Sequence, residues 1–275
     1  MGSFLSQLSQ SWGNIGSALV ITVEGTIGGA ILALVLAFVL GLMALSRFVV
    51  VRGVARTIIE FFRGTSLYVQ LFWLYFALPV LGFKISSALL CAIIAFGLNF
   101  GAYGAEVVRG AINAVPRAQW EGAIALNMSP FQRMRLVILP QAWVAMIPPF
   151  NNLLIQLLKS TPLMSLVTIA DLTFEAQQLR SATGQTAWSY LFLLVVYFIL
   201  AYILTLLMNA LESVAKARLG RGTGLRGIFR MRPADPTGKS LGAGLAGAGT
   251  EIEPVEAANL TSKTMGAGGP GGGGV

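Results

Sequence analysis

Residues Trp188–Leu211 read WSYLFLLVVYFILAYILTLLMNAL, a run without a single charged side chain. A helix needs about 20 apolar residues to cross the hydrocarbon core of a bilayer, so this run is long enough to span a membrane. Four further apolar runs precede it, at Ala18–Leu45, Ile58–Leu81, Ser86–Ile112 and Trp143–Ile169. The sequence therefore predicts an all-α, polytopic membrane protein with about five transmembrane helices.

The composition agrees with lipid as the solvent. Hydrophobic residues make up 55% of the chain and charged residues 11%, with a mean hydropathy of +0.74, whereas soluble domains carry roughly 25% charged residues. A soluble protein with a very apolar core is the alternative, and the length of the apolar runs argues against it. The chain has no histidine, which excludes imidazole catalysis and histidine-based metal sites. Its one cysteine, Cys91, lies in an apolar run, so we expect a packing role and no metal site.

The positions of Lys and Arg predict the orientation of the helices. None precedes the first run, and the C-terminal segment carries eight. The four connecting regions carry four, one, four and one when Arg63 and Arg109, near the ends of the second and third runs, are counted with them. Cytoplasmic segments collect Lys and Arg, so the N-terminus is expected outside and the C-terminus inside. The net charge of +8 therefore need not indicate nucleic acid binding. We expect membrane lipid and no nucleic acid among the partners.

Three regions follow from this pattern. Residues 1–17 are expected to be an external segment without a signal peptide, and residues 18–215 form the transmembrane domain. Residues 216–275 are basic and then glycine-rich. We expect a disordered cytoplasmic tail there, because the segment has little apolar surface to bury.

The segment from 119 to 140 predicts two short helices on the cytoplasmic surface. Ser129-Pro130 is a strong helix start, with serine at the N-cap and proline at the first helical position. We therefore expect one helix over Gln119–Leu126 and another over Pro130–Val137. Asn127 lies between them, where a chain reversal often requires a positive φ that asparagine tolerates.

This loop resembles the signature loop of permeases in bacterial ATP-binding cassette (ABC) importers. That pattern is Glu-Ala-Ala, three residues, Gly, nine residues and Ile-x-Leu-Pro. The matching positions here are Glu121-Gly122-Ala123, Asn127, Val137 and Leu139-Pro140. Gly122, Asn127 and Val137 depart from the family's alanine, glycine and isoleucine.

Three further segments resemble the polar amino acid branch of these permeases, the histidine and glutamine type. They are Glu60–Phe72, where Ser66 replaces a proline, Ala105–Glu121, and Leu157–Leu163. The last is similar to Leu-Leu-Lys-Asp-Thr-Ser-Leu, with Ser160 and Pro162 as departures. The resemblance covers roughly residues 15 to 215.

The resemblance implies a permease subunit in the bacterial cytoplasmic membrane that imports amino acids or similar small zwitterions. A permease for a compatible solute such as ectoine is the alternative within this family. It implies a second permease subunit, identical or related, and an extracytoplasmic solute-binding protein that delivers the substrate. It also implies that the loop docks into a groove of a separate ATP-hydrolysing subunit. The residues concerned are Glu121, Gly122, Ala123, Asn127, Phe131, Arg133, Arg135, Leu139 and Pro140. A solvated loop whose charges only set the topology is the alternative.

No ATP site is expected on this chain. Gly238-Lys239-Ser240 resembles the end of a phosphate-binding P-loop, but the first glycine of that motif would fall at Pro233. We therefore expect no enzyme activity from this chain alone, with ATP hydrolysed by the partner subunit. A self-sufficient secondary transporter or channel is the alternative function, although the sequence shows no internal repeat of the kind that such transporters carry.

Polar residues inside the predicted spans are the candidate substrate site, since charged side chains deep in a membrane are costly. Lys159 offers a cation for a substrate carboxylate, and Glu106 offers an acceptor for its ammonium group. Asn99, Gln156, Ser160 and Thr161 supply nearby polar groups. The alternatives are a structural Glu106–Lys159 ion pair, or Glu106 acting at the cytoplasmic interface.

The fourth run contains three prolines. Pro148, Pro149 and Pro162 are expected to break this helix and to free backbone groups toward a cavity. Asp171 and Glu175 follow the run and are expected at the outer mouth, where they face either a solute-binding protein or solvent.

Overall fold

The structure, a computed structural model, describes residues 2–218, and this part of the chain contains helices and no strand. The polytopic all-α prediction is confirmed. The tail predicted from residue 216 lies outside the described residues, except for its first three residues, which end the last helix.

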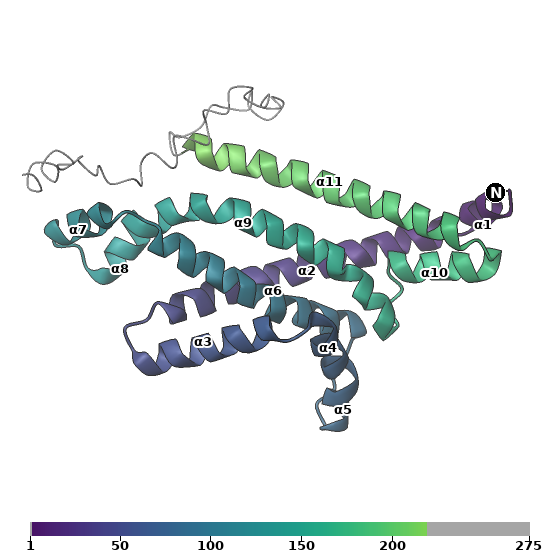
Figure 1. Ribbon diagram of the computed structural model, residues 1–275, viewed down its shortest axis with the longest axis horizontal. Coiled ribbons are helices and arrows are strands. Elements are labelled where there is room, and N and C mark those ends of the chain that lie inside the picture. The colour runs from purple at the N-terminus through teal and green to yellow at the C-terminus, as the bar shows by residue number, and fades with distance from the viewer. Residues whose placement is uncertain (1, 219–275) are drawn as a thin grey trace, which may run out of the picture. The chain divides into compact units, whose positions relative to one another are not determined.

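Three long helices correspond to the first, third and fifth predicted spans (Figure 1). They are α2 (Trp12–Ala44), α6 (Ala88–Asn113) and α11 (Thr186–Arg218). Each is long and apolar enough to cross a bilayer. Most of the large apolar side chains of α11 remain exposed, which suits a helix that faces lipid.

The second predicted span is broken, so the expected single helix over Ile58–Leu81 is wrong. One helix, α3 (Val49–Gly64), begins nine residues before Ile58. Thr65 and Ser66 are extended, and the chain resumes with α4 (Leu67–Phe72), a π-helical segment (Trp73–Ala77) and α5 (Leu78–Val80). Figure 1 shows α4 and α5 turning away from the direction of α3.

The fourth predicted span is α9 (Leu139–Ser160), which continues as a 3₁₀ segment over Thr161–Val167. Pro148 and Pro149 lie inside α9, so the expected break at these prolines is wrong. Each removes one backbone donor, but a helix packed in a membrane keeps its remaining backbone bonds because no water competes for them. The change from α to 3₁₀ geometry does occur next to Pro162.

Helix length alone therefore supports fewer spans than the five expected. Among the described residues, three helices qualify singly, and a fourth span results if Pro130–Val167 and α10 (Leu172–Thr183), bent by 56°, are counted as one. The stretch Leu67–Val80 is apolar but shorter than a full span.

The bundle is organised around α2 and α6, which make the most extensive helix contact. Glycines of α6 allow this close approach. A Cβ atom added at Gly104 would lie 2.7 Å from the Cβ of Ala37, and one added at Gly101 would lie 2.8 Å from the Cβ of Leu36. Small residues at helix contacts are typical of membrane bundles, where packing replaces the hydrophobic effect.

The N-terminal residues fold onto α10. The predicted external segment 1–17 contains α1 (Gly2–Gln10) and the start of α2, and α1 packs against α10. Asp171 caps α10 through a 3.0 Å bond from the backbone N–H of Phe174 to Oδ1.

Opposite ends of the bundle differ in charge. Figure 1 shows α1 and α10 at one end, and the α2–α3 connection with α7 (Arg117–Ala125) and α8 (Pro130–Gln132) at the other. Arg47 and Arg117 belong to the second end. This grouping agrees with the predicted cytoplasmic side.

Candidate functional site

A polar cavity of about 470 Å³ lies where α6 and α9 meet the break between α3 and α4. Its size falls within the range of small-molecule sites. Four of the six residues predicted for substrate binding line it, namely Asn99, Gln156, Lys159 and Ser160. The other lining residues are Thr65, Ser66, Leu67, Phe100 and Tyr103.

Helix periodicity brings the polar groups of α9 to one face. Lys159 and Ser160 follow Gln156 by three and four residues, which places all three side chains on the same side of the helix. The Ser160 hydroxyl donates to the Gln156 carbonyl at 2.9 Å. The side chains of Gln156 and Lys159 are exposed, so they are available to a molecule in the cavity.

The broken helix end forms the opposite edge of the cavity. Because Thr65 and Ser66 leave the helical conformation, the carbonyl of Phe62 loses its usual donor four residues later. Two side-chain amides replace that donor: Asn99 Nδ2 at 3.0 Å and Gln70 Nε2 at 2.9 Å. Both side chains are buried. Asn99 thus joins α6 to the end of α3 and fixes the edge of the cavity.

The wall formed by Tyr103 carries a positive charge behind it. The Tyr103 hydroxyl donates to the Arg63 carbonyl at 3.3 Å, and the Arg63 guanidinium lies 5.4 Å from the centre of the Tyr103 ring. Arg63 also forms a 3.5 Å ion pair with Glu60, whose side chain is 72% exposed.

Glu106 lies apart from this cavity. Its carboxylate accepts hydrogen bonds from Arg109, at 3.2 and 3.1 Å from Nε and 2.5 Å from Nη2. Among residues 2–218, no ion pair involves Lys159, so the alternative of a structural Glu106–Lys159 pair is wrong. Arg109 follows Glu106 by three residues on the same helix, and ion pairs at this spacing form without any tertiary contact.

Thr161 also lies outside the cavity lining. It is fully buried, and its hydroxyl donates to the Leu158 carbonyl at 2.8 Å and lies 3.0 Å from the Tyr197 hydroxyl. These contacts join the start of the 3₁₀ segment to α11.

The predicted helix pair of the cytoplasmic loop is present. Ser129 caps α8: its hydroxyl accepts from the Gln132 N–H at 3.3 Å, and Gln132 Oε1 accepts from the Ser129 N–H at 3.0 Å. The expected helix over Pro130–Val137 is correct in place, but it continues through a π-helical segment (Arg133–Ile138) directly into α9. The loop helix is therefore continuous with the helix that carries Lys159.

Asn127 adopts the positive φ that its position predicts, with a value of 53°. The N–H of Met128 bonds to the Ala123 carbonyl at 3.1 Å, and the N–H of Asn127 bonds to the Ile124 carbonyl at 2.8 Å. This pair of bonds is the Schellman arrangement that ends many helices. It explains why a residue tolerant of left-handed geometry is needed at 127.

The loop presents apolar side chains to its surroundings. Ile124, Leu126, Phe131 and Leu136 are 56%, 77%, 71% and 61% exposed. The remaining residues predicted to contact the ATPase differ in how far they are buried. Ala123 is buried, Arg133 and Leu139 are half-buried, and Glu121, Gly122, Arg135 and Pro140 are exposed. Arg133 lies 5.6 Å from the centre of the Trp120 ring, which links the second helix to α7.

Comparison with known proteins identifies the family. Residues 25–216 match the family described as binding-protein-dependent transport system inner membrane component. The chain belongs to this family. A probable amino-acid ABC transporter permease protein of Sinorhizobium fredii, y4tF, is 43% identical over 216 residues, covering 75% of this chain and 91% of the relative. The arginine transport system permease protein ArtQ of Bacillus subtilis is 34% identical over 200 residues, covering 72% and 91%.

Solved structures agree with this assignment. The crystal structure of an amino acid ABC transporter with histidines matches with a TM-score of 0.68 and 31% identity, covering 78% of this chain and 98% of the solved one. An inward-facing structure of the MetNI methionine ABC transporter matches in fold, with a TM-score of 0.64 and 20% identity over 75% and 98% of the two chains. The chain is thus a multi-pass inner-membrane permease of an ABC importer. It is a transport component of that importer and not a secondary transporter.

Several lining residues of the permease were missed by sequence reasoning. Thr65 and Ser66 were noted only as part of a motif, because nothing in the hydropathy marks a break there. Tyr103 follows Asn99 by one helical turn and could have been found from that spacing.

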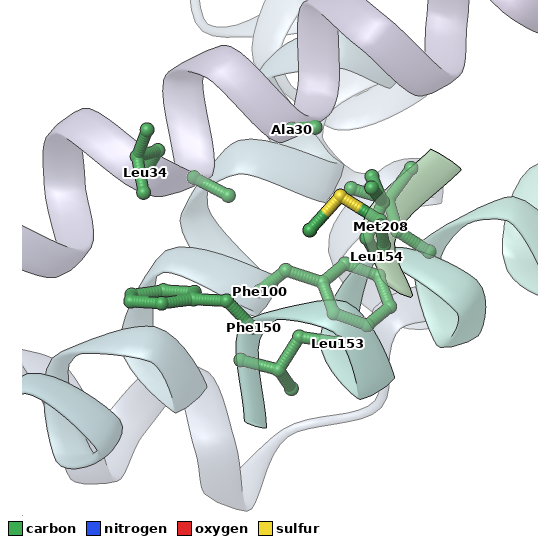
Figure 2. A pocket seen from close by; sticks show the side chains of 9 residues that line it. Ala30, Leu34, Phe100, Phe150, Leu153, Leu154 and Met208 are labelled. Carbon is green, nitrogen blue, oxygen red and sulfur yellow. The ribbon is translucent and has the colours of Figure 1, made fainter. Parts of the chain in front are cut away.

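A second cavity of the permease, about 170 Å³ in volume, lies between α2, α6, α9 and α11. Figure 2 shows Ala30 and Leu34 of α2 on one side and Phe100, Phe150 and Leu153 on the other. All nine lining side chains are apolar, so this cavity offers no partner for the charged groups of a zwitterion. The polar cavity around Lys159 is therefore the better candidate for the substrate.

Proposed function

We propose that this permease imports amino acids as one membrane subunit of an assembly. A second permease subunit, identical or related, completes the pathway, a separate ATPase drives it, and a solute-binding protein delivers the substrate from outside. The names of the relatives support the substrate class, since they describe amino-acid, arginine and L-cystine permeases.

The observation that carries the proposal is the polar cavity around Lys159. A lysine deep within a membrane protein is costly unless it faces a water-filled or substrate-filled space. Here Lys159 shares such a space with the amides of Asn99 and Gln156 and the hydroxyl of Ser160. An ammonium group and neutral hydrogen-bonding groups at one site match the carboxylate and ammonium groups of an amino acid.

The loop between α6 and α9 supports the proposed ATPase contact. Its exposed side chains combine an apolar centre, including Phe131, with the charges of Glu121 and Arg135. Such a surface suits a protein partner, because apolar contacts supply affinity and surrounding charges supply specificity. The direct continuation from α8 into α9 then connects the ATPase to the substrate cavity.

The experiment uses the permease assembled with its ATPase and solute-binding protein, and measures ATP hydrolysis with and without amino acids. We expect amino acids to stimulate hydrolysis, and Lys159→Ala to reduce that stimulation by about tenfold. Unchanged stimulation in the Lys159→Ala assembly contradicts the proposed role of the cavity.

A separate measurement addresses the ATPase contact. Phe131→Asp places a charge in the apolar centre of the loop, so we expect the ATPase to be lost when the permease is purified. Phe83→Asp is the matched control, since Phe83 is equally exposed at 70% but belongs to the connection between α5 and α6. Retention of the ATPase by the Phe131→Asp variant contradicts docking at this loop.

A further inference from the structure

The lining of the polar cavity carries a positive charge and no negative one. Lys159 is its only cationic side chain, and none of the lining residues is Asp or Glu. The nearby carboxylates are engaged elsewhere, with Glu106 bound to Arg109 and Glu60 bound to Arg63.

An ion pair of Arg63 and Glu60 lies behind the Tyr103 wall of the cavity. The Arg63 guanidinium group is 5.4 Å from the ring centre of Tyr103 and 3.5 Å from Glu60. Because the charges of this pair offset each other, the uncompensated charge at the cavity is that of Lys159.

Neutral oxygens are available to a substrate ammonium group. The Ser160 hydroxyl donates its hydrogen to the Gln156 carbonyl, which leaves the lone pairs of its oxygen free to accept. Asn99 donates through Nδ2 to the Phe62 carbonyl, which leaves Oδ1 free. One carboxylate and one α-ammonium group therefore both find partners in the cavity.

We propose that the cavity selects amino acids whose side chain is neutral or acidic and rejects those whose side chain is cationic, because Lys159 supplies a positive charge and position 160 carries no carboxylate. The proposal rests on the proposed function of amino acid import. A guanidinium or a second ammonium group finds no carboxylate in the lining, and it is repelled by the charge of Lys159. Ser160 stands where a carboxylate would reverse this preference, because it lies beside Lys159 in the same lining.

Binding is measured on the permease assembled with its ATPase in lipid nanodiscs. The solute-binding protein is left out, because it makes a selection of its own. Radiolabelled L-glutamine, L-glutamate and L-arginine are the probes. We expect glutamine and glutamate to bind about tenfold or more tightly than arginine.

Four variants test which side chains cause this charge selectivity. Ser160→Asp is expected to shift the ratio of arginine to glutamate affinity by about a hundredfold toward arginine, whereas Ser160→Ala, which adds no charge, leaves that ratio unchanged. Lys159→Met is expected to weaken glutamate binding by about tenfold or more. Lys84→Met is its control, since Lys84 is exposed outside the cavity.

The outcomes separate this proposal from the proposed function. Arginine binding as tight as glutamine binding, or an unchanged ratio in the Ser160→Asp variant, overturns the charge selection and leaves amino acid import standing. Failure of all three amino acids to bind, together with no ATP-driven uptake of any of them, overturns the proposed function instead.

Discussion

The junction between α3 and α4 depends on one backbone carbonyl that two side chains share. Phe62 O accepts from Gln70 Nε2 at 2.9 Å and from Asn99 Nδ2 at 3.0 Å, and Gln70 Nε2 also lies 2.6 Å from Thr65 Oγ1. Replacing one amide by leucine leaves the carbonyl with the other donor. Replacing both leaves this partly buried carbonyl without either donor, so we expect the two substitutions to be coupled.

The magnitudes follow from these contacts. Gln70→Leu removes the bonds of Nε2, but it also removes Gln70 Oε1, a buried oxygen without a partner among the described residues. We therefore expect Gln70→Leu and Asn99→Leu to lower the free energy of unfolding by about 1 kcal/mol each. The double variant should lose about 1 kcal/mol more than their sum, because a partly buried carbonyl that has lost both donors carries a desolvation penalty.

Unfolding of the purified permease by sodium dodecyl sulfate in mixed micelles measures these differences. Gln178→Leu is the control, since Gln178 is exposed on α10 and its loss should change stability by less than about 0.5 kcal/mol. Strictly additive losses in the double variant would refute the shared-carbonyl reasoning. So would a Gln178→Leu loss as large as that of Gln70→Leu.

Two further predictions concern packing and the loop. Gly104→Ala should lower the free energy of unfolding by about 2 kcal/mol, because the new methyl group meets Ala37 at 2.7 Å; Gly110→Ala on the same helix meets nothing within 4 Å and should be neutral or stabilising. In the loop, Asn127→Val should lower the thermal midpoint and Asn127→Gly should not, since only the valine is strained at a φ of 53°; equal midpoints would contradict this explanation.

Much of the fold could be predicted because the membrane imposes simple rules. Apolar runs gave the positions of α2, α6 and α11, since any segment that crosses lipid must pair its own backbone groups. Local backbone chemistry was equally informative: Ser129 caps its helix and Asn127 takes a positive φ, as their residue types require.

The missed features depend on tertiary contacts. The break at Thr65 and Ser66 lies in a run whose hydropathy is continuous, and it is stabilised by Asn99, a residue of another helix. Pro148 and Pro149 are accommodated inside α9 although their chemistry favours a break. Sequence alone shows neither the distant donor nor the packing that tolerates the lost bonds.

The candidate site was predicted in part. Polar residues inside apolar runs indicated Asn99, Gln156, Lys159 and Ser160, and the structure places them in one cavity. Glu106 was grouped with them because of its charge, whereas a local partner, Arg109, engages it. Their role in binding substrate stays a prediction.

ATP-dependent uptake into proteoliposomes tests the central claim most directly. The vesicles contain this permease with its ATPase and any second permease subunit, receive the solute-binding protein and radiolabelled L-glutamine or L-glutamate at the outer face, and hold ATP inside. We predict uptake only when ATP, the ATPase and the solute-binding protein are all present. Uptake by the permease alone under an ion gradient, or no uptake of any amino acid by the complete assembly, would contradict the account.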